Sequence, residues 1–170
     1  GTTSVAIGTN ALHTATVASG NVAIGYQALD VCTVANNTAI GLNAGGSVTT
    51  GVNNVAVGSG ALDGTDDGRE NTAVGYLSVS ANAGDGNTGV GNEALTAATG
   101  NNNTAMGRNA GVSVAAGSNN LLLGTDAGRT GSPGGNINSE SNEIVLGDEN
   151  ITAANIQVDW TVASDKRDKT

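Results

Sequence analysis

Three aspartates gather in one short, glycine-containing stretch and are the first residues that could bind a cation. Asp63, Asp66 and Asp67 fall within residues 63–68. Carboxylates in such loops are typical calcium ligands. Their spacing, however, matches neither the helix–loop–helix calcium loop nor the glycine-rich nonapeptide calcium repeat. We therefore expect a solvated turn here and no metal site.

The nucleophiles and bases of the chain do not form a recognisable catalytic set. His13 is the sole histidine and Cys32 the sole cysteine, so a Ser-His-Asp triad or a zinc site would need partners that the sequence does not show. We expect His13 at the surface and Cys32 packed as a small apolar side chain. No pair of carboxylates stands out as a glycosidase pair. The sequence therefore predicts neither an enzyme nor a cofactor.

Asparagine is the polar residue with the most regular spacing. It stands four residues before a glycine in seven successive copies of one short phrase, typified by residues 37–41, Asn-Thr-Ala-Ile-Gly. If the copies stack in register, these amides can hydrogen-bond along the stack as a ladder. An equally simple interpretation is that asparagine tolerates a left-handed turn. The residues of this predicted Asn ladder are Asn21, Asn37, Asn54, Asn71, Asn87, Asn103 and Asn120.

The phrase that carries these asparagines recurs with a fixed period over most of the chain. Its closing glycine returns at steps of 16 or 17 residues, from Gly8 to Gly124. Such a period indicates a repeat architecture. One repeat is too short for a helix pair or a propeller blade, and its alternation favours a strand. The sequence predicts an all-β fold, a parallel β-solenoid (β-roll) of about eight 16–17-residue coils, roughly 40 Å long.

Each repeat is expected to hold two strands and two turns. The first strand ends at the repeated glycine, where we expect a positive φ or a close approach of two backbones. The second is expected in stretches such as 14–17 and 112–115. Branched residues alternate with a small alanine in the first strand. We expect the branched side chains to form a thin core, and the alanine column to let another sheet approach closely.

Composition and charge limit the partners of such a rod. The chain has no Phe, one Trp and two Tyr, so its core is weak for its length. We infer that each rod packs against copies of itself in a closed cyclic assembly. The formal net charge of −9, three times that for three chains, argues against nucleic acid and anionic membranes as partners. No apolar run has the length of a membrane span, so we expect no membrane insertion.

The periodic array ends before the chain does. We expect the solenoid in residues 1–128, a loop that breaks the period in 129–142, and C-terminal strands with a cap in 143–163. Residues 151–158 alternate like a strand, and we expect Trp160 after them to cap a core rather than to bind sugar. Because the chain opens inside a repeat, we expect it to be a fragment of a longer protein.

The repeats and the tail each resemble a known family. The pattern Asn-Thr-Ala-Ile-Gly-x-x-Ala-Leu, whose halves stand at 37–41 and 25–29, resembles the collar and head repeats of trimeric autotransporter adhesins and, more closely, phage tail-fibre repeats. Residues 160–169 resemble the junction, roughly Ser-Asp-x-Arg-x-Lys, that precedes an intramolecular chaperone of the endosialidase type. The matching residues are Ser164, Asp165, Arg167 and Lys169.

The resemblance implies how such a chain would mature. Residues 164–170 would join a chaperone domain outside this chain, which trimerises the fibre, helps it fold and then cuts itself off between Ser164 and Asp165. Setting the register from one end is physically useful, because near-identical repeats permit slips by a whole coil. The base and the oxyanion site for the cut would lie in the chaperone, so no catalytic residue is expected in this chain.

Two functions are open at this point. The resemblance implies a structural and adhesive segment of a trimeric phage tail fibre, part of the virion, which joins upstream fibre or tail proteins and attaches to a host receptor, either glycan or protein. The alternative is the head domain of a bacterial trimeric adhesin at the cell surface. A depolymerase tailspike is disfavoured, since the sequence has few aromatic residues to line a groove. We expect three chains to pack side by side, each coil closed within its own chain, rather than to wind around a common axis.

Overall fold

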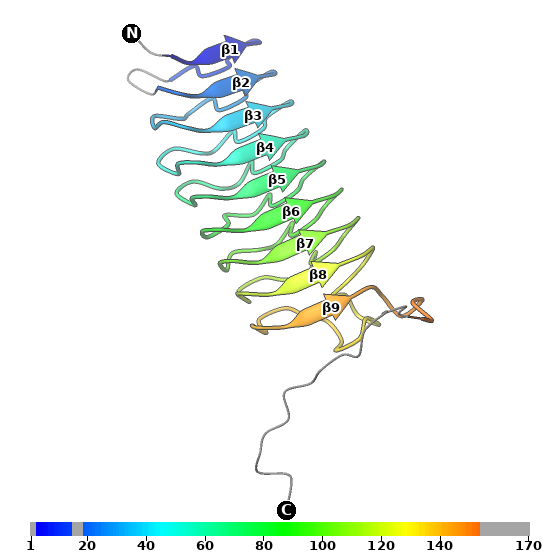
Figure 1. Ribbon diagram of the computed structural model, residues 1–170. Coiled ribbons are helices and arrows are strands. Elements are labelled where there is room, and N and C mark those ends of the chain that lie inside the picture. The colour runs from blue at the N-terminus through cyan, green and yellow to red at the C-terminus, as the bar shows by residue number, and fades with distance from the viewer. Residues whose placement is uncertain (1–2, 15–18, 154–170) are drawn as a thin grey trace, which may run out of the picture.

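The computed structural model describes residues 3–14 and 19–153. Within these residues the chain forms one sheet of nine three-residue strands and no helix (Figure 1). In chain order the strands are β1 (Val5–Ile7), β2 (Val22–Ile24), β3 (Thr38–Ile40), β4 (Val55–Val57), β5 (Thr72–Val74), β6 (Thr88–Val90), β7 (Thr104–Met106), β8 (Leu121–Leu123) and β9 (Ile144–Leu146).

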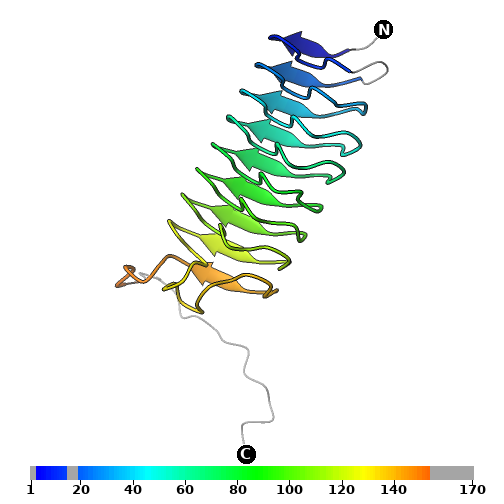
Figure 2. The ribbon, with the colours of Figure 1, turned by 180° about the vertical axis from the view of Figure 1, so that it is seen from behind.

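The strands pair in parallel and in chain order, which confirms the predicted parallel β-solenoid. Equivalent residues pair with one another, as Ala23 does with Ala39. Successive strands follow at 16 or 17 residues from β1 to β8, whereas β9 follows β8 after 23. The views from the front and from behind both show the strands stacked as steps along one rod (Figures 1 and 2). Each coil closes within its own chain.

Each described coil contains one strand, so the predicted second strand is wrong. Residues 112–115 form turns and bends. Opposite the strand, residues such as Leu29 (φ 49°) and Leu62 (φ 56°) adopt left-handed backbone conformations, which a strand does not accommodate. These turns close the coil within its short period, yet they still bond from coil to coil, as the N–H of Leu29 donates to the carbonyl oxygen of Ala44 at 3.0 Å.

The two faces of the strand are the reverse of the prediction. The central alanine points into the coil, where Ala23, Ala39 and Ala73 are fully buried. Its neighbours in the strand point outwards, and Ile7 and Met106 are 58% and 53% exposed. The reason is the width of the coil, because larger side chains from the opposite turn fill it and leave room for only a small residue facing them. These buried side chains are Leu29, Val48, Leu62, Val79, Leu95 and Val114.

Large and small residues compensate for one another in this interior. Leu29 of one coil lies over Gly45 of the next, where a Cβ atom would come within 2.9 Å of the leucine Cδ2. Strand β8 carries Leu122 in place of the central alanine, and the opposite turn then carries Gly128, whose missing Cβ leaves the space that Leu122 Cδ2 occupies. Large side chains thus lie against glycines in the interior, as close packing requires.

The glycine that ends each strand has the predicted conformation. Gly25 and Gly58 have φ values of 138° and 135°. A Cβ atom on either would overlap the carbonyl oxygen of the equivalent glycine one coil further on, Gly41 or Gly75. Glycine is therefore required at these positions for two reasons, the backbone conformation and the close approach of two backbones.

After Gly128 the chain departs from the regular coil. Residues 129–136, here called the inserted loop, precede Ile137, which returns to the core and is 2% exposed. The N–H of Ile137 donates to the carbonyl oxygen of Gly128 at 2.9 Å, so the loop begins and ends at one point of the coil. Strand β9 then continues the sheet in the register of β8.

Candidate functional surfaces

The asparagines of the predicted ladder stack along the inside of the rod. All seven are buried, with at most 2% exposure. The Oδ1 atom of each accepts a hydrogen bond from the backbone N–H of the equivalent residue in the next coil, as Asn54 does from Asn71 at 2.9 Å. The bonds thus run mostly from side chain to backbone, and only the pair Asn103 and Asn87 adds a contact between two side-chain amides, at 3.1 Å.

The amide nitrogen of each ladder asparagine binds the next coil as well. Asn54 Nδ2 donates to the carbonyl oxygen of Gly68 at 2.9 Å, and Asn71 Nδ2 to that of Gly84 at 2.8 Å. None of the seven has a positive φ; the left-handed residue is the one before, such as Asn53 (φ 62°). Their hydrogen-bonding capacity is used within the rod, so this set of residues stabilises the stack and does not face a ligand.

A second, exposed ladder runs beside the first and was not predicted from the sequence. Here a side-chain oxygen accepts from the N–H of the preceding coil, as Asn101 Oδ1 does from Asp85 at 2.7 Å. The signal in the sequence is a polar residue two positions before the ladder asparagine. The four accepting residues are Asp85, Asn101, Ser118 and Ser141.

The outward side of the sheet forms a continuous apolar stripe, here called the outer sheet face. It consists of the first and third residues of every strand: the third is apolar in all nine strands, whereas the first is Val, Ile or Leu in five strands and Thr in four. Val5, Ile40 and Ile144 are 45%, 39% and 64% exposed. Nine strands at about 4.8 Å spacing make the stripe roughly 38 Å long. Contiguous apolar surface of this extent marks an interaction surface.

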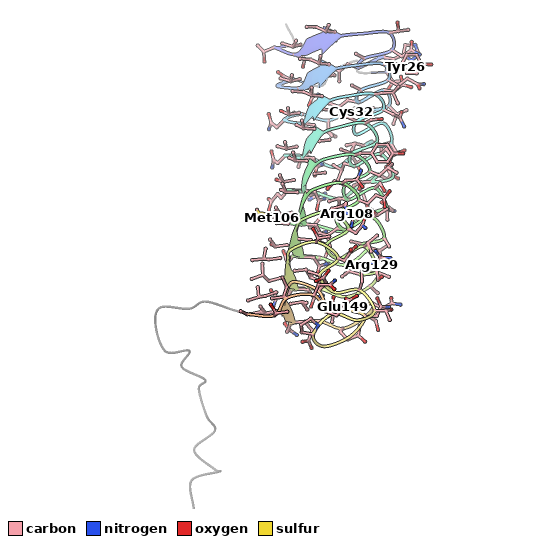
Figure 3. The ribbon with its side chains drawn as sticks, turned by 90° about the vertical axis from the view of Figure 1, so that its right-hand side faces the viewer. Tyr26, Cys32, Met106, Arg108, Arg129 and Glu149 are labelled. Atoms are coloured by element: carbon pink, nitrogen blue, oxygen red, sulfur yellow. The ribbon has the colours of Figure 1, made fainter. Side chains whose placement is uncertain are left out.

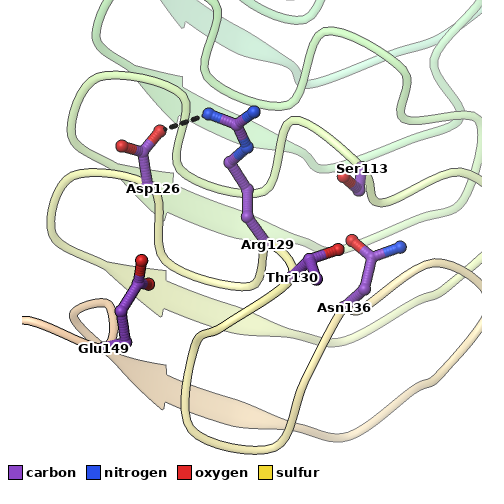
Figure 4. A pocket seen from close by; sticks show the side chains of 6 residues that line it. All are labelled: Ser113, Asp126, Arg129, Thr130, Asn136 and Glu149. Atoms are coloured by element: carbon purple, nitrogen blue, oxygen red, sulfur yellow. Dashed lines mark hydrogen bonds and ion pairs between the residues drawn. The ribbon is translucent and has the colours of Figure 1, made fainter.

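A polar pocket of about 340 Å³ lies at the inserted loop, and we call it the loop pocket (Figure 4). Its side chains come from three parts of the chain: the turn before β8, the turn and loop after β8, and the segment after β9. Figure 3 shows Met106, on the outer sheet face, on the opposite side of the rod from Arg108, Arg129 and Glu149. The pocket is lined by Ser113, Asp126, Arg129, Thr130, Asn136 and Glu149.

Asp126 is the electrostatic centre of this pocket. Its Oδ1 accepts hydrogen bonds from Asn109 Nδ2 at 2.9 Å and Arg129 Nη1 at 2.7 Å, and Arg108 Nη2 lies 3.3 Å from its Oδ2. The hydrogen bonds from Asn109 and Arg129, together with the two positive charges, hold the pKa of the carboxyl group below its ordinary value of 3.8, against the opposing effect of burial. Asp126 is therefore ionised at neutral pH and fixes the orientation of Arg129.

The residues first considered for chemistry lie apart from one another. His13 is 64% exposed, with Nδ1 3.4 Å from Asp30 Oδ1. Cys32 is buried, and burial raises the pKa of its thiol. Asp66 accepts a hydrogen bond from the Thr49 hydroxyl of the neighbouring coil. In the described ranges no group of three or more His, Cys, Asp and Glu side chains is placed to hold a metal ion.

Several of the predicted features lie wholly or partly outside the described residues, and of the strand predicted at 14–17 only residue 14 is described. The junction residues Ser164 and Asp165 and the predicted cap Trp160 fall beyond residue 153. Of the predicted strand at 151–158, only residues 151–153 are described, and they form no strand. The described part of the chain contains no helix long and apolar enough to cross a membrane. Comparison with family models, curated proteins and solved structures found no match to this chain.

Proposed function

We propose that this chain is a structural and adhesive segment of a trimeric phage tail fibre that serves attachment of the virion to its host. The observation that carries the proposal is the outer sheet face. A rod of stacked coils whose apolar stripe runs along its whole length has a surface that a second and third copy can cover.

The outer sheet face also corrects the expectation of which surface would associate. The alanines are inside the coil, so the branched residues, not the alanine column, are available to other chains. Three rods that turn this stripe towards a common axis would bury it on all three chains at once, in a closed cyclic assembly. The number three rests on the resemblance of the repeats to phage tail-fibre and trimeric adhesin repeats.

A stiff trimer suits the mechanical part of this function. Each coil is joined to the next by the strand pairing, by the Asn ladder and by bonds between turns. Side-by-side packing of three such rods adds burial that the thin interior of one coil cannot supply. The proposed partners are two copies of the same chain, upstream fibre or tail proteins, and a glycan or protein receptor on the host.

Light scattering of the purified chain tests the assembly. We expect a mass three times the chain mass of 16.4 kDa. Replacing Ile40 and Val57, which pair on the outer sheet face, by lysine is expected to yield monomers, because six buried charges would face the axis of the trimer. The matched control is Leu42→Lys, an exposed apolar residue in the turn after β3, which should leave the mass unchanged. A stable, folded monomer of the unaltered chain would contradict the fibre proposal.

The second candidate is the head domain of a bacterial trimeric surface adhesin, whose collar and head repeats the pattern also resembles. The tail discriminates between the two, because a chaperone junction belongs to the fibre. If the chain is produced together with its natural downstream sequence, we expect a product that ends at Ser164, detected by its intact mass. Ser164→Ala should abolish that product. Uncleaved, membrane-anchored protein would favour the adhesin.

A further inference from the structure

We propose that the loop pocket binds one neutral sugar unit of a glycan. This inference rests on the proposed attachment function and assigns to it a site and a ligand class. The pocket is the place where the chain departs from its period, and its lining combines side chains from the turns after β7, β8 and β9.

The inserted loop is held in one shape by its own hydrogen bonds. Ser132 is 6% exposed, and its Oγ donates to the carbonyl oxygen of Asp126 at 3.0 Å and accepts from the N–H of Gly128 at 3.1 Å. The closure between Gly128 and Ile137 fixes the two ends. A pocket on such a loop is formed before the ligand arrives, which lowers the entropic cost of binding.

Hydrogen-bonding groups of both kinds converge on the pocket. Asp126 orients the guanidinium of Arg129 through Nη1, which leaves the remaining N–H groups of Arg129 to donate to a ligand. Within the described residues, the side chains of Thr130, Asn136 and Glu149 have no hydrogen bond to the protein, and neither has that of Ser113. Hydroxyl, amide and carboxylate groups without protein partners match the alternating donors and acceptors of sugar hydroxyl groups.

The charges of the lining select among polar ligands. Arg129 carries one positive charge, and Asp126 and Glu149 carry two negative ones. This balance disfavours phosphate, nucleic acid and acidic sugars, which need an excess of positive charge. No aromatic side chain and no large aliphatic side chain lines the pocket, so an apolar ligand is disfavoured as well. The class of ligand that remains is a neutral, polyhydroxylated ring.

The size and position of the pocket fit this ligand. Its volume of about 340 Å³ lies at the lower end of small-molecule sites, which suits a single sugar ring held with a dissociation constant on the order of 1 mM. Association through the outer sheet face would leave the pocket open, because the two lie on opposite sides of the rod (Figure 3). Three pockets on one trimer would raise the avidity for a surface that displays many copies of the sugar.

Amide chemical-shift titration of the labelled protein tests the proposal. The probes are methyl glucoside, methyl galactoside, methyl mannoside and N-acetylglucosamine, with N-acetylneuraminic acid as the acidic probe, each up to about 50 mM, far above the expected dissociation constant. We expect at least one neutral probe to shift the amides of residues 113, 126–131, 136 and 149 and to leave those of β2 to β6 unchanged. Thr130→Val combined with Glu149→Gln should weaken binding by about tenfold or more.

The matched control is Ser139→Ala, an exposed serine that follows the loop and does not line the pocket, which should bind like the unaltered chain. The absence of shifts with every neutral probe, equal binding by the double variant, or a preference for the acidic probe would each overturn the inference. A trimer without sugar binding would refute this site while leaving the fibre proposal intact. A monomer that binds sugar would do the reverse.

Discussion

The regular coils and the inserted loop hold their backbones in place by different means. In the coils, hydrogen bonds between residues about one period apart, as between Asn54 and Asn71, are added to local turns such as that between Val48 and Gly45. In the loop they run between neighbours, as Ser132 donates to Arg129 and Gly135 to Ser132 through their backbone N–H groups at 2.9 and 2.8 Å. The coils are therefore stabilised by stacking in addition to local turns, whereas the loop relies on its own local turns.

This difference decides where specific chemistry can arise. A side chain repeated in every coil stabilises the stack. The buried asparagines, for example, form their side-chain hydrogen bonds with the neighbouring coil. The loop pocket instead combines residues of different types from the turns after β7, β8 and β9. Repetition provides length and stiffness, whereas the break in the repetition creates the loop pocket.

Substitution of glycine separates the two regions most strongly. At Gly58 (φ 135°) a Cβ atom would overlap the carbonyl oxygen of Gly75, whereas at Gly134 (φ 84°) it would meet nothing within 4 Å. Gly58→Ala is therefore expected to cost more than about 4 kcal/mol of unfolding free energy, and Gly134→Ala about 1–2 kcal/mol from the positive φ alone. Chemical denaturation at one fixed protein concentration measures both. Similar costs at the two sites would show that the coils do not depend on close backbone approach.

The Asn ladder provides the next largest effect. Asn71→Ala removes the acceptor of the Asn87 N–H and the donor to the Gly84 carbonyl, both at 2.8 Å. Because buried polar groups are left unpaired, we expect a loss of about 2–4 kcal/mol. The control Asn92→Ala alters an exposed asparagine in a neighbouring turn and should stay within about 0.5 kcal/mol of the unaltered chain. Equal losses would argue that the ladder does not stabilise the stack.

Within the loop, Ser132 takes the place that the ladder asparagines have in the coils. Ser132→Ala removes one bond to Asp126 and one to Gly128, and we expect a loss of about 1–2 kcal/mol. The loss should be local, so amide hydrogen exchange should quicken in residues 128–137 and stay unchanged in β4 and β5. Ser139→Ala, exposed and outside the loop, is the control. Faster exchange along the whole rod would mean that the loop is part of the stack.

The periodic part of the molecule could be predicted from the sequence because one short rule is repeated many times. The period, the parallel sheet and the glycine at the end of each strand all follow from the phrase at residues 37–41. The direction of the faces does not follow from it. Alternation places Ala39 and Ile40 on opposite sides, but it does not say which side is inside until the size of Leu29 in the opposite turn is taken into account.

The second half of each coil and the pocket were harder to foresee for separate reasons. Leucines with a positive φ, such as Leu62, are unusual. The apolar residues in the second half of each coil therefore predict a strand rather than a turn. Ser113 and Thr130 stand 17 residues apart and Asp126 and Glu149 stand 23 apart, which are the steps from β7 to β8 and from β8 to β9, but the period does not show that these two pairs line one pocket. A weak signal did exist, since Arg108 and Asp126 stand about one coil apart and form an ion pair at 3.3 Å.

Two aspartates, Asp63 in the regular coils and Asp126 in the turn that leads into the inserted loop, are expected to respond to pH in opposite directions, and this is the smallest effect. Burial in the array raises the pKa of Asp63 above its ordinary value of 3.8, against hydrogen bonds from its own N–H and that of Gly64. The hydrogen bonds from Asn109 and Arg129 lower the pKa of Asp126. The folded state thus favours the neutral form of Asp63 and the ionised form of Asp126.

The sign of each contribution follows from this difference. The stability that ionised Asp126 contributes is fully present above pH 3.8 and is lost as the pH falls through its lowered pKa. The stability that neutral Asp63 contributes is present below pH 3.8 and is lost as the pH rises through its raised pKa. At pH 7, Asp126→Asn should therefore reduce the unfolding free energy and Asp63→Asn should leave it unchanged or raise it, each by about 1 kcal/mol or less. At a pH below the ordinary aspartate pKa of 3.8, both changes in the unfolding free energy should become smaller. Two variants that shift stability in the same direction at pH 7 would contradict the opposite shifts of the two pKa values.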